Sequence, residues 1–118
     1  MRIGTNAQGF ETTTAIDNFI RDEVELKFDP FRDQVISIDV FMKDINGPKG
    51  GVDKQVVVKA RLRNRQRIAL ETTHENLYAA LKLGLRKSRR AVRRSLRKSG
   101  RIDRLSVRKL LLKDHVTV

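Results

Sequence analysis

The chain has 118 residues, no cysteine, and 26 Lys and Arg against 14 Asp and Glu, which gives a net charge of +12. This composition predicts one domain with one hydrophobic core, excludes disulfides, thiolate metal sites and cysteine nucleophiles, and favours a polyanionic partner. With no bilayer-length apolar run and no signal-peptide pattern at the start, we expect a soluble, cytoplasmic protein without a membrane-spanning segment.

The N-terminal part of the chain predicts a strand followed by a helix. Residues 2–6 alternate in polarity, as in a short strand. The threonines at 12–14 offer helix N-caps, and Thr14 with Asp17 resembles a capping box. We expect the helix to end near Phe28, because a proline follows two residues later. Its apolar stripe consists of Ile16, Phe19, Ile20 and Val24.

Three further segments alternate with a period of two and predict strands: residues 35–43, 55–63 and 67–73. The short link at residues 64–66 predicts a tight hairpin, although it contains no glycine. One apolar face on each strand and one apolar stripe on each helix favour an α+β two-layer domain, a four-stranded mixed sheet with both helices on one face. The first two strands should be parallel and the last three an antiparallel meander.

Residues 75–100 predict a long helix with two unlike sides. One side is apolar or small and should face the core: Leu77, Leu81, Gly84, Leu85, Ser88, Val92, Ser95 and Leu96. The other side is basic: Lys82, Arg86, Arg89, Arg90, Arg93, Arg94 and Arg97, with Lys87 and Lys98 at its margin. Like charges three and four residues apart repel each other. A helix with so many of them is expected to bind nucleic acid. The alternative, a basic side that only faces solvent, is less favoured.

Three details of this helix are also expected from the sequence. Thr73 or His74 is predicted near its N-cap. Gly84 and Ser88, four residues apart, are predicted to let it approach the first helix closely. After it, residues 101–118 are expected to form a basic C-terminal tail. A disordered end is favoured there, with a short helix, or an arm lying on the domain or on its partner, as alternatives.

The loop at residues 44–54 contains three glycines and a proline. It fits a long hairpin loop that needs positive φ angles, or a backbone that approaches phosphate between Lys49 and Lys54. It matches no nucleotide-binding motif. His74 and His115 are expected to have cap or surface roles, and neither the serines nor any His and carboxylate cluster suggests a nucleophile or a metal site. We therefore expect no enzymatic activity, no cofactor, no metal and no small-molecule substrate.

The string NGPKGGVDKQ, two alternating strands, and ENLYAAL at the start of a basic helix resemble the ribosome hibernation promoting factor family. Its members are also called ribosome-associated inhibitors or sigma-54 modulation proteins. The resemblance spans residues 1–100 and is to the short form of the family. It implies a β-α-β-β-β-α domain that binds the small ribosomal subunit and its rRNA in the channel used by mRNA and tRNA. Such a protein would compete with both, inhibit translation and protect idle ribosomes.

The resemblance also implies which residues contact rRNA. Lys87, Arg90 and Arg94 fall where the family places rRNA-binding residues on its second helix, and Lys49 and Lys54 match its loop. The other basic residues of the helix, Lys82, Arg86, Arg89, Arg93 and Arg97, join them as candidates, and Arg21 and Lys27 of the first helix are weaker ones.

The chain departs from the family pattern at Lys82, usually acidic or an amide, and at Gly84 and Ser88, usually larger and apolar. Two alternatives remain from the residues alone. One is a general double-stranded RNA-binding protein. The other, a binder of membrane surfaces or acidic proteins, is the weaker alternative because the sheet needs the apolar side of the basic helix, so we expect no membrane partner.

Overall fold

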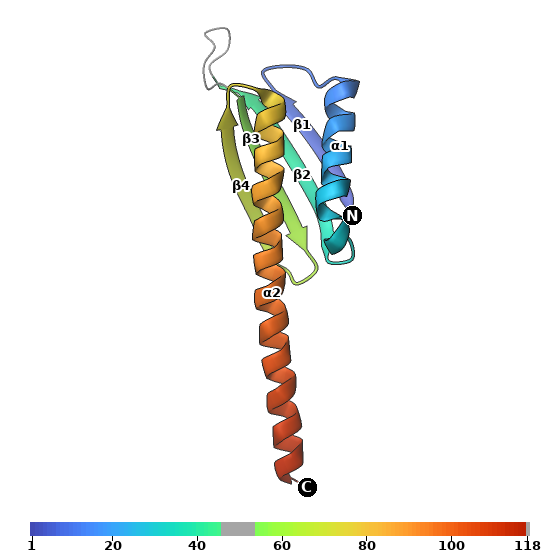
Figure 1. Cartoon of the computed structure of the whole chain (residues 1–118), viewed down its shortest axis with the longest axis vertical. Coiled ribbons are helices and arrows are strands. Elements are labelled where there is room, and N and C mark those ends of the chain that lie inside the picture. Colours follow the sequence, from blue (N-terminus) through green and yellow to red (C-terminus); the bar gives the residue numbers. More distant parts are fainter. Residues whose placement is uncertain (46–53, 118) are drawn as a thin grey trace.

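The computed structural model describes residues 1–45 and 54–117 of the chain, and the side chains of residues 1–45 and 54–98. The elements follow one another in the predicted β-α-β-β-β-α order (Figure 1). They are β1 (Arg2–Gln8), α1 (Thr14–Phe28), a short 3-10 helix (Asp29–Phe31), β2 (Val35–Asp44), β3 (Lys54–Leu62), β4 (Arg67–His74) and α2 (Leu77–Thr117).

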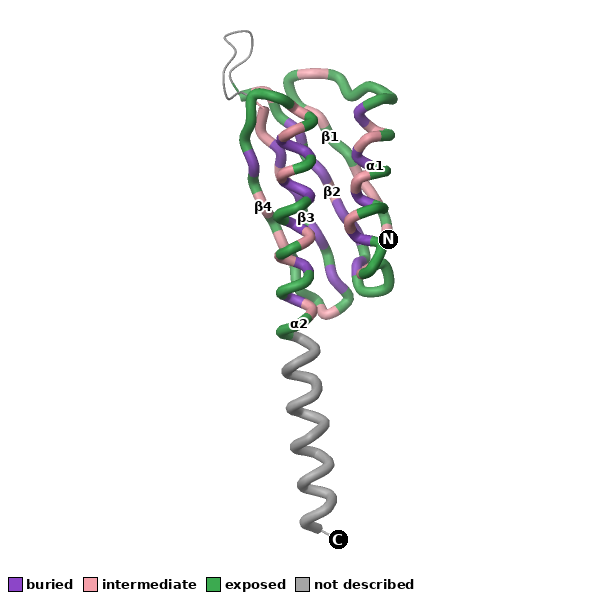
Figure 2. Tube along the Cα trace, in the orientation of Figure 1, coloured by how far each residue is buried: buried purple, intermediate pink, exposed green. Residues whose placement is uncertain are grey.

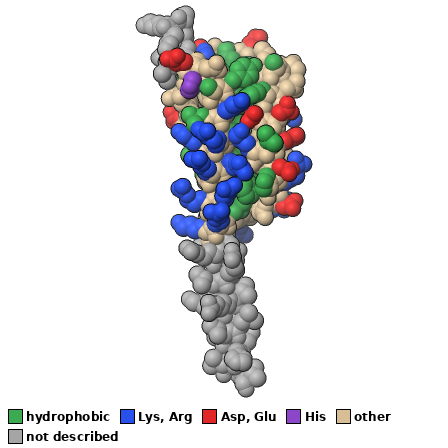
Figure 3. All heavy atoms as spheres, in the orientation of Figure 1, with side chains coloured by type: hydrophobic (Ala, Val, Ile, Leu, Met, Phe, Trp, Pro, Cys, Tyr) green, Lys and Arg blue, Asp and Glu red, His purple; other side chains and the backbone are tan. Residues whose placement is uncertain are grey.

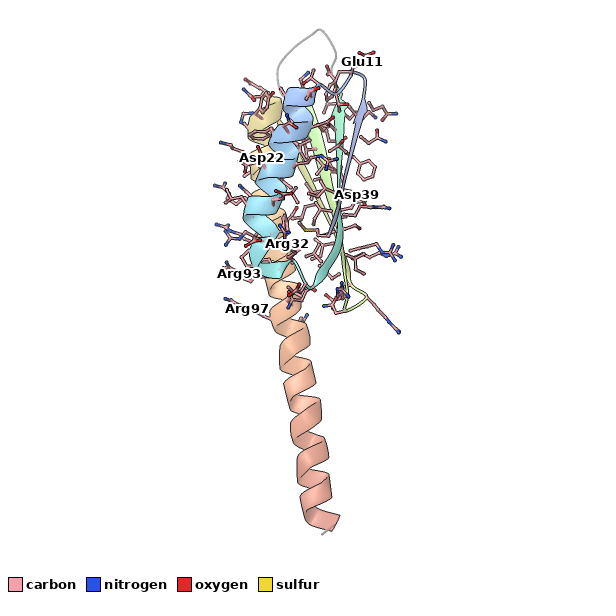
Figure 4. All side chains as sticks on the ribbon, turned by 90° about the vertical axis from the view of Figure 1, so that its right-hand side faces the viewer. Glu11, Asp22, Arg32, Asp39, Arg93 and Arg97 are labelled. Carbon is pink, nitrogen blue, oxygen red and sulfur yellow. The ribbon has the colours of Figure 1, made fainter. Side chains whose placement is uncertain are left out.

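The four strands form one sheet in the order β1-β2-β3-β4. β1 runs parallel to β2, whereas β2 with β3 and β3 with β4 are antiparallel, which confirms the predicted topology. Both helices lie on one face of the sheet, as the view turned by 90° shows (Figure 4). α2 packs on β3 and β4, and α1 packs against β1 and α2. No described helix or strand covers the other face.

The core lies between the sheet and the helices (Figure 2). Alternate residues of each central strand point into it, because side chains of a strand alternate between its two faces. The helices contribute Ile20, Val24 and Phe28 from α1, and Leu81, Leu85 and Val92 from α2, all 0% exposed. Each such side chain stabilises the fold by about 1.5 to 3 kcal/mol relative to exposure. The predicted apolar stripes of both helices are therefore confirmed.

The start of α1 differs by one residue from the predicted capping box. Thr13 is the N-cap, with extended backbone angles (φ −104°, ψ 162°), and its hydroxyl accepts a hydrogen bond from the Ile16 N–H at 3.2 Å. Thr14 is already the first helical residue, so it cannot cap. The Asp17 carboxylate instead accepts a hydrogen bond from the Thr5 hydroxyl at 3.2 Å and joins α1 to β1.

The start of α2 also lies later than predicted. The Asn76 side-chain oxygen accepts hydrogen bonds from the N–H groups of Tyr78 (2.9 Å) and Ala79 (3.3 Å), so Asn76 is the capping residue. Thr73 and His74 lie near this cap, as predicted, but they are the last residues of β4 and neither of them caps the helix. His74 has a supporting role, since its Nδ1 accepts a hydrogen bond from the Asn76 N–H at 2.9 Å.

Gly84 of α2 faces the sheet and not α1, which corrects its predicted role in bringing the two helices together. A Cβ atom on Gly84 would lie 3.4 Å from Thr72 Oγ1 and 3.5 Å from Val58 Cγ2, both in strands. Ser88 is buried, and its hydroxyl donates a hydrogen bond to the Gly84 carbonyl oxygen at 2.7 Å. The missing side chain of Gly84 thus lets α2 lie close to β3 and β4.

α2 continues beyond residue 100 to Thr117, in place of the disordered end that the sequence favoured. It projects past the end of the sheet in Figure 1. Gly100 does not end the helix, because one interior glycine costs only about 1 kcal/mol and the following segment is rich in Arg, Lys and Leu. Among the described helices, none is both long and apolar enough to cross a membrane.

Candidate nucleic-acid interface

The outward side of α2 carries a continuous basic surface, seen as the cluster of blue side chains in Figure 3. We call it the basic face of α2. It comprises Lys82, Arg86, Lys87, Arg89, Arg90, Arg93, Arg94 and Arg97, all exposed except the half-buried Arg89. In Figure 4, Arg93 and Arg97 point away from the sheet on the side of the helices. The structure therefore brings together all eight candidates that the sequence placed on this helix.

The positive charges of this surface are not neutralised within the described part of the molecule. The ion pairs there join Lys27 to Glu23, Arg32 to Asp29, and Lys54 to Asp44, and none involves the basic face of α2. Lys82 makes a cation–π contact, with its Nζ 5.9 Å from the centre of the Phe19 ring. Because like charges on one helix repel each other, this arrangement favours binding of a polyanion.

The rotation of α2 about its axis is fixed by the residues on its inner side. Leu81, Leu85 and Val92 are buried against the sheet, so the basic side chains must face outward. Near the end of the sheet, Ser95 of α2 donates a hydrogen bond to the side chain of Gln66 in the β3–β4 turn. At the start of the helix, Tyr78 packs edge-on against Phe19 of α1, with ring centres 4.9 Å apart. These contacts hold the basic face on a rigid support.

Arg89 differs from the other seven residues. Its side chain is half-buried, and its Nε–H is buried with no hydrogen-bond partner among the described residues. A buried donor without a partner costs free energy. The long stem of Arg89 thus serves as packing surface, and Arg89 is the least available of the eight for a direct contact.

The two weaker candidates lie on α1, whose outer surface is mainly acidic. Lys27 forms an ion pair with Glu23 at 2.5 Å, and both side chains are largely buried. It also lines a hollow of about 410 Å³ together with Lys82 and Arg86 of α2. Arg21 is exposed. The acidic residues of α1 are Asp17, Asp22, Glu23 and Glu25. They make the surface of α1 mainly negative, whereas that of α2 is positive (Figure 3).

Of the two candidates from the segment between β2 and β3, Lys54 is the one that the structure describes. Lys54 begins β3, and its Nζ lies 2.9 Å from Asp44 Oδ2 and 6.0 Å from the centre of the Phe10 ring. This ion pair joins the two ends of the loop. Lys49 lies outside the described residues, so its rRNA contact stays a prediction.

The described residues contain no group of three or more His, Cys, Asp or Glu side chains that could hold a metal ion. His74 Nδ1 is occupied by the hydrogen bond from Asn76. Asn76 was not predicted as a cap, although an Asn just before an apolar helical pattern is a typical N-cap signal. The pair Ser95 and Gln66 was not predicted either, because no local sequence pattern indicates it.

Solved structures of two other proteins have a similar fold. One is a ribosomal subunit interface protein from Coxiella burnetii, at 17% identity and a TM-score of 0.67, with 80% of this chain and 97% of that chain covered. The other is the N-terminal domain of Protein Y from Thermus thermophilus, at 19% identity and a TM-score of 0.67, with 80% and 98% covered. No curated protein sequence matches the chain.

A family model for sigma 54 modulation protein / S30EA ribosomal protein matches residues 3–99. The matched region contains α1, the basic face of α2, and the sheet except for Arg2 at the start of β1. The chain therefore belongs to the sigma 54 modulation protein / S30EA ribosomal protein family, the ribosome hibernation factors, whose members are non-enzymatic modulators that bind ribosomes.

Proposed function

We propose that the chain is a hibernation factor that binds the small ribosomal subunit through the basic face of α2. It occupies the channel used by mRNA and tRNA, inhibits translation, and protects the idle ribosomes of stressed or stationary-phase cells in the cytoplasm. The observation that carries the proposal is the set of eight cationic side chains on one helix, none of which pairs with a described acidic residue. Membership of a ribosome-binding family supports rRNA as the polyanion.

The electrostatics of the domain support binding to a phosphate backbone. Six of the eight residues of the basic face are arginines, and the planar guanidinium group donates paired hydrogen bonds to phosphate oxygens. Each phosphate that a cationic side chain neutralises releases counterions, which makes binding strong at low salt and salt-dependent. The acidic surface of α1 would repel RNA, so α2 is the side that faces it.

Burial disfavours the membrane alternative. A helix that lies on a lipid surface inserts its apolar side into the bilayer, but Leu81, Leu85 and Val92 are 0% exposed and already packed against the sheet. General binding to double-stranded RNA is the remaining alternative, because a basic helix can contact the phosphates of any A-form duplex.

Competition on purified small subunits tests the proposal. The protein is expected to co-sediment with empty subunits, and to bind more weakly to subunits loaded first with mRNA and initiator tRNA. Because the two effects share one coupling free energy, excess protein must weaken mRNA and tRNA binding by the same factor. In a purified translation system, the same excess should stop initiation.

Two outcomes would contradict the proposal. Equal affinity for loaded and empty subunits would place the site outside the channel. Equal affinity for a naked RNA duplex and for subunits, at the same salt concentration, would favour the general RNA-binding alternative.

A further inference from the structure

The face of the sheet that no helix covers has its own basic surface, at the end where β3 turns into β4. We call it the arginine hairpin: Arg61, Arg63, Arg65 and Arg67, which occupy every second position and are all exposed. The turn joining the strands lies at the lower end of the sheet in Figure 1. None of these four arginines is among the rRNA-binding residues expected from the sequence.

The arginine hairpin is electrostatically strained. Arg61 and Arg67 are directly opposite each other in the antiparallel pair of β3 and β4, an arrangement in which like charges destabilise a sheet. Within the described residues, none of the four arginines makes an ion pair. Asp39 lines the same 340 Å³ hollow as Arg61 and Arg67, but Lys59 lines it as well, so three cations meet one acid there.

The backbone of the turn adds a second cost. Arg65 has a φ of 69°, in the left-handed region that glycine adopts most easily. The turn is otherwise well formed: the Arg65 N–H donates to the Leu62 carbonyl at 3.1 Å, and the Gln66 N–H donates to the Asn64 side chain at 3.0 Å. An arginine at a strained position where glycine would fit better points to a use for its side chain.

The arginine hairpin is connected to α2 but faces a different direction. The bond from Ser95 to Gln66 holds the turn against the segment of α2 that contains Arg93 and Arg97. In Figure 4, those two arginines point away on the side of the helices, whereas Asp39 marks the uncovered face on the opposite side. The two basic surfaces therefore lie near the same end of the sheet, on opposite sides of the domain.

We propose that the arginine hairpin is a second RNA-binding surface, which contacts the phosphates of an rRNA segment different from the one on the basic face of α2. This inference rests on the proposed function and adds a clamp to it, with the domain held between two RNA segments. The four arginines line a 210 Å³ hollow in which Ile36 is the one large apolar residue that is exposed. A surface of guanidinium groups with little exposed apolar area suits a phosphate backbone. It suits a protein partner less well, because a protein interface would need buried apolar anchors.

Salt-dependent binding to small subunits tests the charge contribution. Changing all four arginines to Gln should lower the log-log salt slope by about 3, because each phosphate contact contributes about 0.7 to 0.9. Arg65→Gln alone should lower it by about 0.7 to 0.9. The matched control is Lys43→Gln, which removes one charge from an exposed residue at the other end of the same face and should leave the slope unchanged.

Tethered cleavage tests the two-segment arrangement, since a chain without cysteine accepts a single reactive site. Ala69→Cys lies on the uncovered face beside Arg67, and Ala91→Cys lies on α2 beside Arg90. Both variants keep every basic residue. An RNA-cleaving reagent on position 69 is expected to cut an rRNA segment that the reagent on position 91 does not cut.

The outcomes separate this inference from the proposed function. If the unchanged protein fails to bind small subunits, both are overturned. If it binds and the four-arginine variant keeps the same slope, the inference alone is overturned. Cleavage of one shared segment from both positions, or no rRNA cleavage from position 69, would also overturn the inference while the proposed function stands.

Discussion

The hydroxyl of Ser95 on α2 donates a hydrogen bond to the side-chain oxygen of Gln66 in the β3–β4 turn. The two residues are 29 positions apart in the chain, and Ser95 is only 8% exposed. A partly buried bond between distant elements helps to fix their relative position, because it joins a strand turn to a helix 29 residues later. It holds the end of the hairpin beside the segment of α2 that contains Arg93 and Arg97.

Removing this bond should destabilise the domain by a measurable and specific amount. Ser95→Ala is expected to lower the free energy of unfolding by about 1 kcal/mol, the net contribution of a typical hydrogen bond. A double-mutant cycle with Gln66→Ala, followed by urea denaturation, should show a coupling above about 0.5 kcal/mol. The control is Ser88→Ala, because the Ser88 hydroxyl bonds within its own helix. Additive effects of Ser95→Ala and Gln66→Ala would contradict the prediction.

Gly84 offers a test of how closely α2 packs on the sheet. The Cβ of an alanine there would meet its nearest neighbours at 3.4 to 3.6 Å, which is ordinary contact or its close limit. Gly84→Ala should therefore raise the free energy of unfolding, by up to about 1 kcal/mol from helix propensity. A loss of stability in the same denaturation experiment would mean that Thr72 and Val58 cannot accommodate a methyl group.

The neighbouring Ser88 should respond in the opposite direction. It is 0% exposed, so a larger side chain there cannot turn toward solvent. Ser88→Leu should lower the free energy of unfolding by about 1 to 3 kcal/mol through overpacking. A higher melting temperature for Ser88→Leu would reveal a cavity at this position instead.

The basic face of α2 should act as a distributed charge surface in ribosome binding. Changing Lys87, Arg90 and Arg94 together to Gln is expected to lower the log-log salt slope for small subunits by roughly 2. All three are exposed, so the melting temperature should change little. The matched control keeps the charge: Lys87→Arg with Arg90→Lys and Arg94→Lys should preserve the slope. An unchanged slope in the Gln variant would remove this helix from the interface.

Periodicity in the sequence predicted most of the fold, because the side chains that point into the core recur with the period of the helix or strand that carries them. The pattern at residues 35–43 located β2, and the stripe of Ile16, Ile20 and Val24 located the buried side of α1. The caps were missed by one to three residues. Several polar residues stand near each helix start, and only the backbone angles decide which of them caps.

The basic face of α2 was also predictable, because the spacing of residues along one helix determines which charged side chains share a side of it. The arginine hairpin was not found, although the alternation from Arg61 to Arg67 was visible in the sequence. Its significance depends on a three-dimensional fact: both helices cover the same face and leave the other open (Figure 4). The partner of Gly84 depended in the same way on the placement of α2 over β3 and β4.

Arg65 allows stability and RNA binding to be separated in one residue. Arg65→Gly should raise the free energy of unfolding by about 0.5 to 1 kcal/mol, because relief of the left-handed strain exceeds the extra entropy of an unfolded glycine. If the arginine hairpin contacts rRNA, the same change should lower the salt slope and the affinity for small subunits. Arg65→Gln is the control, since it removes the charge and keeps the strain, and should weaken binding without a gain in stability.

A glycine variant that is more stable and binds as well as the unchanged protein would show that Arg65 does not contact RNA. One that is less stable would show that the side chain itself supports the turn.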